Sequence, residues 1–260
     1  MKLSRRLQYI MEQLPHGSRF ADIGSDHALL PVAAIKSGRV IQAIAGEVNL
    51  GPLDAASKQV LAAGLKDQIS VRLGDGLEVI SAGEVDVITI AGMGGSLISS
   101  ILNSGQDKLQ GVKMLVLQPN VGEDILRRWL LDNHWVLTSE HIMEEDRKIY
   151  EVLTAVPVSE GDYDQSNQDL YREYRLHNAT TSEQEVAVTK GILLRMGPWL
   201  IKNPNPIFVT KWMSEILKLE RILESINTSN LPSSEEKSKE VSEEIQQIKG
   251  VLACLQKDRL

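Results

Sequence analysis

The chain has 260 residues, enough for one large core or for a core with a smaller attachment, and its apolar fraction of 42% is ordinary for a globular protein. No apolar run approaches the roughly 20 residues that cross a bilayer, and no apolar segment follows the basic N-terminus as in a signal peptide, so we expect a protein that is neither membrane-spanning nor secreted. The net charge of −7 argues against a protein that coats nucleic acid nonspecifically, since that mode of binding depends on neutralising phosphates.

Short apolar runs alternate with helical patterns through the first 158 residues. Seven runs have the length of strands, and other segments space their apolar residues as helices do. We expect strands at Phe20–Ile23, Val40–Ala45, Ile69–Leu73, Val85–Ile90, Val112–Leu117, Trp135–Thr138 and Tyr150–Val156, and helices at residues 2–14, 28–35, 50–64 and 123–132. Strands joined by helices form a doubly wound α/β sheet, which the last two runs would close as a hairpin.

The alternation stops after residue 158. The polar segment 161–178 is interpreted as a connection with room for a helix, and the pattern is helical from Gly191 onward. Two sets of apolar residues then step by 4, 3, 4 and 3 positions, as in a coiled coil. They are Trp212, Ile216, Leu219, Leu223 and Ile226, and Val241, Ile245, Ile248, Leu252 and Leu255. A polar break at 227–234, with a capping box from Ser233 to Glu236, predicts an antiparallel helical pair over about residues 204–258.

One glycine, Gly24, connects the first strand to the helix that follows. A dinucleotide fingerprint would need further glycines, and the chain instead has Asp26 where backbone amides and the helix dipole would receive a pyrophosphate. A second anion would be repelled there, whereas a positively charged ligand without phosphate would not. S-adenosylmethionine, with its sulfonium, is the common cofactor of that description.

Four carboxylates stand at or near the ends of consecutive strands. They are Asp22, Asp26, Glu47 and Asp75. Ligands of doubly wound sheets bind at this edge, where an acid about 20 residues after the first loop, as Glu47 is, accepts hydrogen bonds from ribose hydroxyls. Asp75, held between two glycines, suits an adenine amino group. The alternative for Asp22 or Asp75 taken singly is a helix N-cap or a turn residue.

Glycines and amides follow the fourth and fifth strands. Gly92, Met93 and Gly94 would let the backbone approach a ligand closely, and they stand where amino-directed adenine methyltransferases carry Asn-Pro-Pro-Tyr. Without that motif, a ring nitrogen or another atom is favoured as nucleophile over an exocyclic amine. Gln118 and Asn120 are suited to reading a base edge, but they could equally end the strand.

The histidines and the single cysteine indicate neither a metal site nor a nucleophile. His27 beside Asp26 could act as a general base, but a structural role at the start of the helix is favoured because no triad or metal set accompanies it. The other histidines are scattered singly. Cys254 is expected to serve in packing, and the absence of a possible internal disulfide fits a reducing cytoplasm.

Several blocks of the sequence are long and uncommon. They are residues 3–7, 21–28 with Leu30-Pro31, 45–47, 74–80, 90–95 and 117–120, then Gly197-Pro198 and Lys211-Trp212. In these blocks, over nearly its whole length, the chain resembles the bacterial tRNA adenine-22 N1-methyltransferases, a class I S-adenosylmethionine-dependent family. The resemblance implies a Rossmann-like methyltransferase domain, expected at residues 1–158, followed by a coiled-coil-like helical domain at residues 159–260.

The residue patterns and the resemblance together lead to a set of expected roles. Catalytic roles are expected for Asp26 and Asn120, and S-adenosyl-L-methionine binding for Asp22, Gly24, Glu47, Asp75, Gly76, Gly92, Met93 and Gly94. Substrate contacts are expected from Arg5, Arg6, Leu29, Gln118, Lys202 and Lys211. The methyl group would pass in line to adenine N1, with Asp26 accepting a hydrogen bond from the adenine amino group. Leu29 stands where family members often have a tyrosine, a natural platform for a flipped adenine.

Basic residues gather in the first part of the helical region. Between Lys190 and Arg221 there are six basic residues and two acidic ones, so this part, with Arg5 and Arg6, is expected to face tRNA. A solvated helix face is the alternative for any single residue. No metal, no membrane partner and a monomer in the cytoplasm are expected.

Three other functions stay open. They are a methyltransferase acting on another RNA or on a small molecule, an NAD-dependent oxidoreductase on the same sheet, and a noncatalytic tRNA-binding protein. Asp26 and the missing glycines disfavour the oxidoreductase, and the complete set of acidic residues at the strand ends disfavours the noncatalytic protein.

Overall fold

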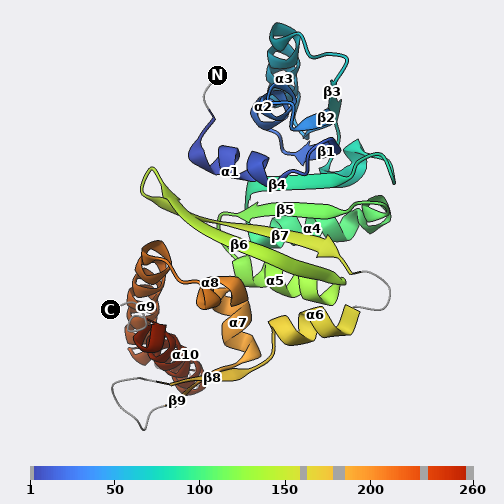
Figure 1. Ribbon diagram of the computed structural model, residues 1–260. Helices are drawn as coiled ribbons and strands as arrows, with labels where there is room; N and C mark the ends of the chain where they lie inside the picture. Colours follow the sequence, from blue (N-terminus) through green and yellow to red (C-terminus); the bar gives the residue numbers. More distant parts are fainter. Residues whose placement is uncertain (1–2, 159–162, 178–184, 229–233, 256–260) are drawn as a thin grey trace. The chain divides into compact units, whose positions relative to one another are not determined.

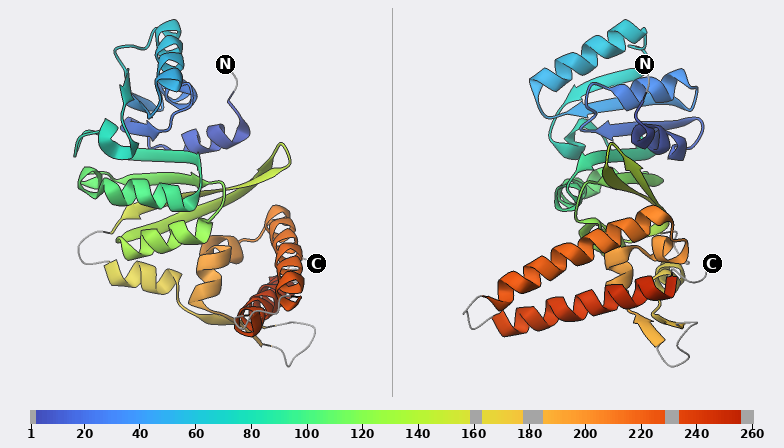
Figure 2. Two further views of the ribbon diagram at one scale, coloured as in Figure 1. Left: turned by 180° about the vertical axis from the view of Figure 1, so that it is seen from behind. Right: turned by 90° about the vertical axis from the view of Figure 1, so that its left-hand side faces the viewer.

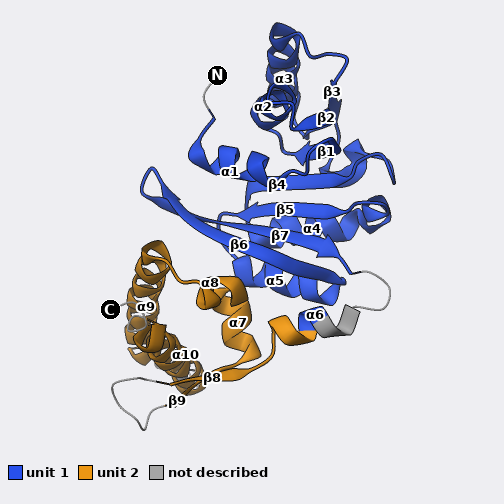
Figure 3. Cartoon of the chain, in the orientation of Figure 1, with its two compact units in different colours: residues 1–167 blue, residues 168–260 orange. Residues whose placement is uncertain are grey.

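The computed structural model describes residues 3–158, 163–177, 185–228 and 234–255. The chain forms two compact units, residues 1–167 and residues 168–260 (Figure 3). Ser233, expected to cap the second helix of the pair, and residues 256–258 at the end of that pair lie outside the described residues. None of the described helices is both long and apolar enough to span a membrane.

The first unit contains a seven-stranded sheet, as the sequence predicts (Figure 1). Its strands are β1 (Ser18–Ile23), β2 (Val40–Glu47), β3 (Ile69–Leu73), β4 (Val87–Met93), β5 (Met114–Pro119), β6 (Trp135–Glu145) and β7 (Lys148–Pro157). They lie in the order β3-β2-β1-β4-β5-β7-β6, and β7 is antiparallel to both of its neighbours. The central parallel strands are rich in buried Val, Ile, Leu and Ala, as expected for a sheet covered on both faces.

The strand order creates a topological switch point at β1. The chain winds outward from β1 through β2 to β3 and then returns to β4 on the other side of β1. Asp22 of β1 accordingly pairs with Ala45 in β2 and with Thr89 in β4. The carboxyl ends of these three strands share one edge, and ligands of doubly wound sheets bind at such a point.

Helices cover both faces of this sheet (Figure 2). They are α1 (Arg5–Gln13), α2 (Leu29–Lys36), α3 (Leu50–Ala63), α4 (Gly95–Ser104) and α5 (Glu123–Asp132), with 3₁₀ turns η1 (Gly76–Val79) and η2 (Gln106–Leu109). Helix α2 packs on α1 and α3, whereas α4 packs on α5, and α4 and α5 lie in front of the strands in the rear view of Figure 2. Right-handed crossovers in opposite directions from β1 put these two groups on opposite faces.

The β6–β7 hairpin is longer than the apolar runs predict. Strand β6 continues from Trp135 to Glu145, and a two-residue turn with positive φ at Asp146 (50°) and Arg147 (61°) leads directly into β7. The expected end at Thr138 is wrong because polar residues are tolerated on a half-exposed ribbon. Strand β5 pairs with β7 only as far as Leu117 opposite Leu153, so the tip of the hairpin extends past the carboxyl end of β5.

The second unit consists mainly of helices. It contains β8 (Tyr174–His177), β9 (Glu185–Val188), α7 (Lys190–Met196), α8 (Pro198–Lys202), α9 (Pro206–Asn227) and α10 (Ser234–Leu255), and α6 (Tyr163–Leu170) spans the boundary between the units. Helices α9 and α10 pack against each other with Trp212, Ile216, Ile245 and Ile248 buried, which confirms the helical pair. The β8–β9 ribbon was not expected, because β8 lies in the polar segment that was interpreted as a connection.

Candidate cofactor and substrate site

The loop after β1 is fastened to the end of β2. The backbone N–H groups of Gly24 and Ser25 both donate to the carbonyl of Gly46, at 3.0 and 3.1 Å. Gly24 has a φ of +70°, which a glycine adopts without strain. This turn sets Asp22, Asp26 and the carboxyl end of β2 around one point of the edge.

Asp22 is buried and serves the loop itself. It is 5% exposed, and its carboxylate accepts hydrogen bonds from the hydroxyls of Ser25 at 2.7 Å and Thr89 at 2.6 Å. Burial raises the pKa of Asp22, while these two hydrogen bonds oppose the rise. The side chain therefore ties the loop to β4.

The next three residues form a left-handed stretch of backbone. Asp26, His27 and Ala28 have φ values of 41°, 66° and 53°, a region that residues other than glycine rarely adopt and then mostly singly. The Asp26 side chain is 84% exposed, and its Oδ1 lies 3.5 Å from Nε2 of His27. Strain of this kind persists only where the surroundings enforce it, and it gathers at functional sites. The stretch presents Asp26 outward just before α2, whose first residue is the half-buried Leu29.

Glu47 is the buried acceptor of this edge. It is 6% exposed, and its Oε1 has no hydrogen-bond partner among the described residues. Burial raises the pKa of Glu47, and the backbone N–H of Asp26, which donates to the carboxylate, opposes the rise. Burying a carboxylate oxygen without a hydrogen-bond donor costs free energy, so this atom is suited to accept hydrogen bonds from a ligand.

Asp75 stands at the N-cap of η1. Its backbone N–H donates to the Glu78 carboxylate at 3.2 Å, and its own side chain is exposed. Gly76 has a φ of +53°, and a Cβ there would come within 2.9 Å of Ile101 Cγ2 on α4. Asp75 and Glu78 form a capping box, so the structural alternative holds for Asp75, and its exposed carboxylate stays accessible beyond β3.

Gln118 holds the loop that follows β4. Its side chain is 0% exposed, and Oε1 accepts hydrogen bonds from the backbone N–H of Gly92 at 3.1 Å and from Nη1 of Arg6. Its Nε2 donates to the carbonyl of Pro119 at 2.8 Å and to Oδ1 of Asn120 at 3.2 Å. Both lone pairs and both protons of the amide are therefore used, and none is left to read a base edge.

Asn120 closes the same network from the exposed side. Its Nδ2 donates to the carbonyl of Gly92 at 2.8 Å, and its backbone N–H donates to the carbonyl of Met93 at 2.7 Å. These bonds fix the backbone of residues 92–94 at the edge next to the loop after β1. The residues expected to contact cofactor on β4 are thus held from β5.

The two arginines of α1 have different surroundings. Their backbone N–H groups donate to the carboxylate of Glu145, at 2.6 Å for Arg5 and 3.2 Å for Arg6, which docks the start of α1 on the hairpin tip. Arg5 is exposed. The half-buried guanidinium of Arg6 lies 5.1 Å above the ring of Tyr150 and donates to Gln118.

Comparison with known proteins identifies the family. The family model for tRNA (adenine(22)-N(1))-methyltransferases matches residues 20–192. The tRNA (adenine(22)-N(1))-methyltransferase of Bacillus subtilis (strain 168) is 42% identical over 253 residues, which cover 97% of this chain and 98% of that protein. The chain belongs to the tRNA (adenine(22)-N(1))-methyltransferase family. The resemblance inferred from the sequence blocks is confirmed.

Solved structures of tRNA (adenine(22)-N(1))-methyltransferases share the fold over both units. The crystal structure of the B. subtilis m1A22 tRNA methyltransferase has a TM-score of 0.84 and 40% identity, covering 96% of this chain and 99% of its own. The Streptococcus pneumoniae protein Sp1610 in complex with S-adenosyl-L-methionine has a TM-score of 0.76 and 37% identity, covering 96% and 100%. The expected Rossmann-like sheet with a following helical part is confirmed.

Two expected substrate residues of this family member belong to the second unit. Lys202 Nζ lies 4.8 Å from the ring centroid of Trp199, and Lys211 Nζ lies 5.7 Å from that of Trp212. Lys202 is exposed and Lys211 is half-buried. Both ammonium groups thus lie over aromatic rings of their own helices, α8 and α9, in cation–π contacts.

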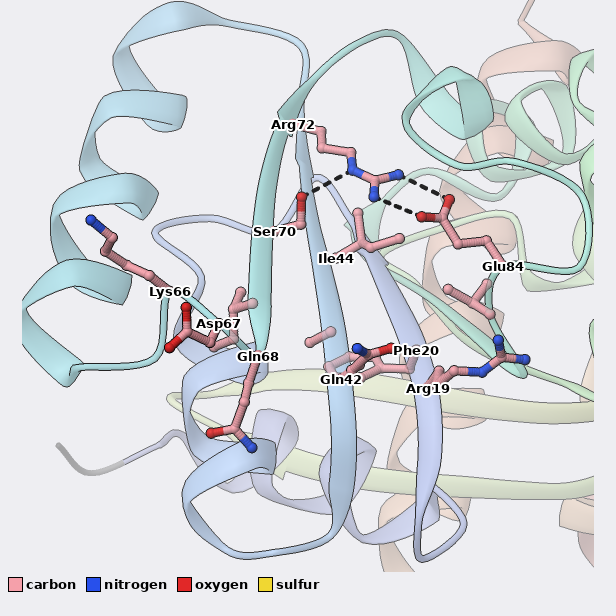
Figure 4. A pocket seen from close by; sticks show the side chains of 13 residues that line it. Arg19, Phe20, Gln42, Ile44, Lys66, Asp67, Gln68, Ser70, Arg72 and Glu84 are labelled. Atoms are coloured by element: carbon pink, nitrogen blue, oxygen red, sulfur yellow. Dashed lines mark hydrogen bonds and ion pairs between the residues drawn. The ribbon is translucent and has the colours of Figure 1, made fainter.

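A separate cavity of about 180 Å³ lies toward the amino ends of β1–β3, away from this edge (Figure 4). Its wall includes Arg72, whose guanidinium makes two hydrogen bonds to Glu84, at 2.6 and 2.9 Å. Arg19, also in the wall, is paired with Asp86 at 3.1 Å. The two arginines of this wall are therefore neutralised within the protein, and Lys66 and Asp67 complete its charged lining. No group of three or more His, Cys, Asp or Glu suited to a metal occurs in the described ranges.

Sequence reasoning missed the residues that support the site. Thr89 could have been found, because it is the one hydroxyl in an apolar strand and stands opposite Asp22 in the parallel register. Tyr150 and Glu145 could not, because their contacts with α1 depend on the length of the hairpin.

Proposed function

We propose that this protein transfers the methyl group of S-adenosyl-L-methionine to N1 of adenine 22 in tRNA. The observation that carries the proposal is the near full-length match to the B. subtilis tRNA (adenine(22)-N(1))-methyltransferase. The acidic edge at the switch point supports it, because this edge offers acceptors to a nucleoside and repels a phosphate.

The residues at the edge fit the cofactor. Glu47 would accept hydrogen bonds from ribose hydroxyls, since its buried Oε1 lacks a donor among the described residues. Asp75 would accept from the adenine amino group, with Gly76 beside it. Gly24, and the backbone of residues 92–94 that comprises Gly92, Met93 and Gly94, would allow close approach. Asp22 would act on the cofactor by shaping the loop that carries Gly24. When bound, the cofactor supplies an electrophilic methyl group on its sulfonium.

The acceptor base requires positioning more than acid–base chemistry. Adenine N1 has a lone pair that is nucleophilic at neutral pH, so the protein has to extrude the base and align it with the methyl group. The exposed Asp26 would accept a hydrogen bond from the adenine amino group and favour the positive charge that develops on the ring. Asn120 would contact the base from the opposite loop, and Leu29 would supply an apolar face against it.

The tRNA would be gripped by the helical part. Lys202 and Lys211, in the basic segment between residues 190 and 221, and the exposed Arg5 would face phosphates. We propose the methyltransferase domain at residues 1–158 and the helical domain at residues 159–260, with the protein acting as a monomer in the cytoplasm.

Methylation of unmodified tRNA transcripts tests the function directly. Purified protein is incubated with labelled S-adenosyl-L-methionine and either a transcript with adenine at position 22 or the same transcript with guanine there. Digestion and mass spectrometry should place one 1-methyladenosine at position 22 of the first transcript and no methyl group on the second. Label at another position, or on both transcripts, would contradict the proposed target, and no label on either would contradict the activity.

A further inference from the structure

The guanidinium of Arg6 is fixed at the carboxyl edge of the sheet. Nη1 donates to Oε1 of Gln118 at the end of β5, and the group lies over the ring of Tyr150. A Cβ placed on Gly92, at the end of β4, would be 3.7 Å from Nη1. A cation held by a buried amide and an aromatic face is not free to follow a mobile phosphate backbone, so it suits a ligand of fixed position.

Arg6 has hydrogen-bonding capacity to spare. Its guanidinium carries five N–H donors, and the one side-chain hydrogen bond it makes within the described residues uses Nη1. Nε and Nη2 donate to no described residue. These two nitrogens form one edge of the planar group, and such an edge binds a carboxylate through two parallel hydrogen bonds.

The position of Arg6 along the edge matches one end of the proposed cofactor. Strand order places the ends of β3, β2, β1 and β4 side by side, carrying Asp75, Glu47, Gly24 and Gly92 in that sequence. Three strand spacings amount to roughly 14 Å. A nucleoside with its adenine at Asp75 and its ribose at Glu47 therefore extends its tail across β1 toward β4, where Arg6 lies.

Charge singles out the group that Arg6 would bind. The methionine tail of S-adenosyl-L-methionine carries a sulfonium and an ammonium, which the acidic edge attracts, and a carboxylate, which it repels. Arg6 is close enough to the edge to act on Asp22, whose pKa its charge lowers. A carboxylate arriving at β4 therefore meets a positive charge rather than another anion.

We propose that Arg6 binds the α-carboxylate of S-adenosyl-L-methionine through its Nε and Nη2 edge while Nη1 stays on Gln118. The inference rests on the proposed function and assigns Arg6 to the cofactor, whereas Arg5, its exposed neighbour, remains with the tRNA. Helix α1 thereby becomes part of the cofactor site through the hairpin that positions it.

Decarboxylated S-adenosylmethionine is the probe, because it lacks only the group in question. Calorimetric titrations without tRNA compare it with S-adenosyl-L-methionine on the wild type, Arg6→Gln, Arg6→Lys and the control Arg5→Gln. The wild type should prefer the carboxylated ligand by about 10- to 100-fold, as for charge-assisted hydrogen bonds. Arg6→Gln should abolish this preference by weakening the binding of S-adenosyl-L-methionine alone. Arg6→Lys should keep a small part of the preference, and Arg5→Gln should keep all of it.

Each other result counts against a definite statement. If Arg6→Gln weakens the binding of both ligands equally, Arg6 acts only through Gln118 and the proposal is overturned. The proposal is also overturned if Arg6→Gln still prefers the carboxylated ligand. If the wild type binds neither nucleoside, the proposed function fails rather than the assignment of Arg6. Circular dichroism and thermal melting establish that the variants are folded. If Arg6→Gln does not fold, the comparison of Arg6→Lys with the wild type tests the proposal.

Discussion

The carboxamide oxygen of Gln118 accepts a hydrogen bond from the backbone N–H of Gly92 at 3.1 Å. The pairing of β4 with β5 shifts between Ala91, opposite Gln118, and Met93, opposite Pro119, so Gly92 is the extra residue of a bulge. Its φ of +80° turns the N–H away from the ladder, and the buried amide supplies the missing partner. The loop expected to meet the cofactor is thus shaped by a side chain of the next strand.

Gln118→Leu tests this support while nearly conserving volume. The substitution leaves the Gly92 N–H without its acceptor, so the free energy of unfolding should fall by about 1–3 kcal/mol in urea titrations. Turnover should fall as well, because the loop loses its fixed position. Gln8→Leu, on the exposed face of α1, should change stability by less than about 0.5 kcal/mol. Equal stability of Gln118→Leu and wild type would refute the structural role of the amide.

Asp26→Ala should abolish methyl transfer with little effect on cofactor binding. The carboxylate is exposed, and we expect it to act on the base, so kcat should fall about 10²- to 10⁴-fold while the Kd for S-adenosyl-L-methionine stays within about threefold. Asp26→Asn separates charge from backbone strain, since asparagine tolerates positive φ better than alanine, and its turnover should be intermediate. His27→Ala is the control and should keep most of the activity. Unchanged turnover in Asp26→Ala would remove this residue from the mechanism.

Glu47→Gln should weaken cofactor binding and stabilise the protein without cofactor. Loss of a charged acceptor for the ribose should raise the Kd about 10- to 100-fold in calorimetry. Burial raises the pKa of Glu47 above 4.5, so the folded state disfavours the ionised form. That penalty is absent at low pH, where both states are protonated, and it grows as pH rises through the raised pKa.

The free Glu47→Gln protein should therefore unfold with a free energy about 1 kcal/mol higher than the wild type at neutral pH. The gap should narrow as the pH falls toward 4.5. A variant that is less stable at neutral pH would mean that Glu47 already has a compensating partner in the free protein.

The sequence predicts the strands, the shared edge of the sheet and the long helices, because these features depend on periodicity and chain order. Seven strands follow from apolar runs, and the placement of Asp22, Glu47 and Asp75 at one edge follows from parallel strands ending together. The heptad steps from Trp212 predict α9, which is confirmed at Pro206–Asn227. These features are local in sequence or are fixed by the rules of sheet winding.

Contacts between distant segments could not be predicted in the same way. The hairpin of β6 and β7 continues through polar residues, and its tip alone explains why Glu145 caps α1 and why Arg6 reaches Gln118. Grouping Arg5 with Arg6 as RNA contacts was reasonable for neighbours on a helix. Only the tertiary contacts separate an exposed arginine from one fixed against a buried amide.

Charge reversal at Lys202 and Lys211 should weaken tRNA binding and flatten its dependence on salt. Each lysine that neutralises a phosphate contributes about 1 to the slope of log K against log salt concentration, so the double variant should lose about 2. Filter binding over a salt series measures both quantities. Lys237→Glu with Lys239→Glu, two exposed lysines of α10, is the matched control and should bind as the wild type does. If tRNA affinity depends on salt concentration in the same way for the wild type and both double variants, Lys202 and Lys211 do not contact the tRNA.

Asp86 should make stability depend on pH at the opposite end of the sheet from the site. Its carboxylate accepts from the backbone N–H of Arg19 at 3.0 Å and pairs with the Arg19 side chain at 3.1 Å and with Lys113 at 3.0 Å. The Arg19 side chain, more than any other group, holds the pKa of Asp86 well below 3.8. Because the folded-state pKa is lowered, this stabilisation is present above pH 3.8 and is lost as the pH falls below it.

Asp86→Asn should accordingly lower the free energy of unfolding at neutral pH by about 1–2 kcal/mol, a range reduced for the partial exposure of Arg19. Below pH 3.8 the difference from the wild type should shrink, since the wild-type carboxyl is then protonated in the unfolded chain. Asp107→Asn removes an exposed carboxylate 3.4 Å from Lys108 and should cost less than about 0.5 kcal/mol at any pH. If the two variants lose the same stability, the Arg19 and Lys113 contacts contribute no more than a surface ion pair.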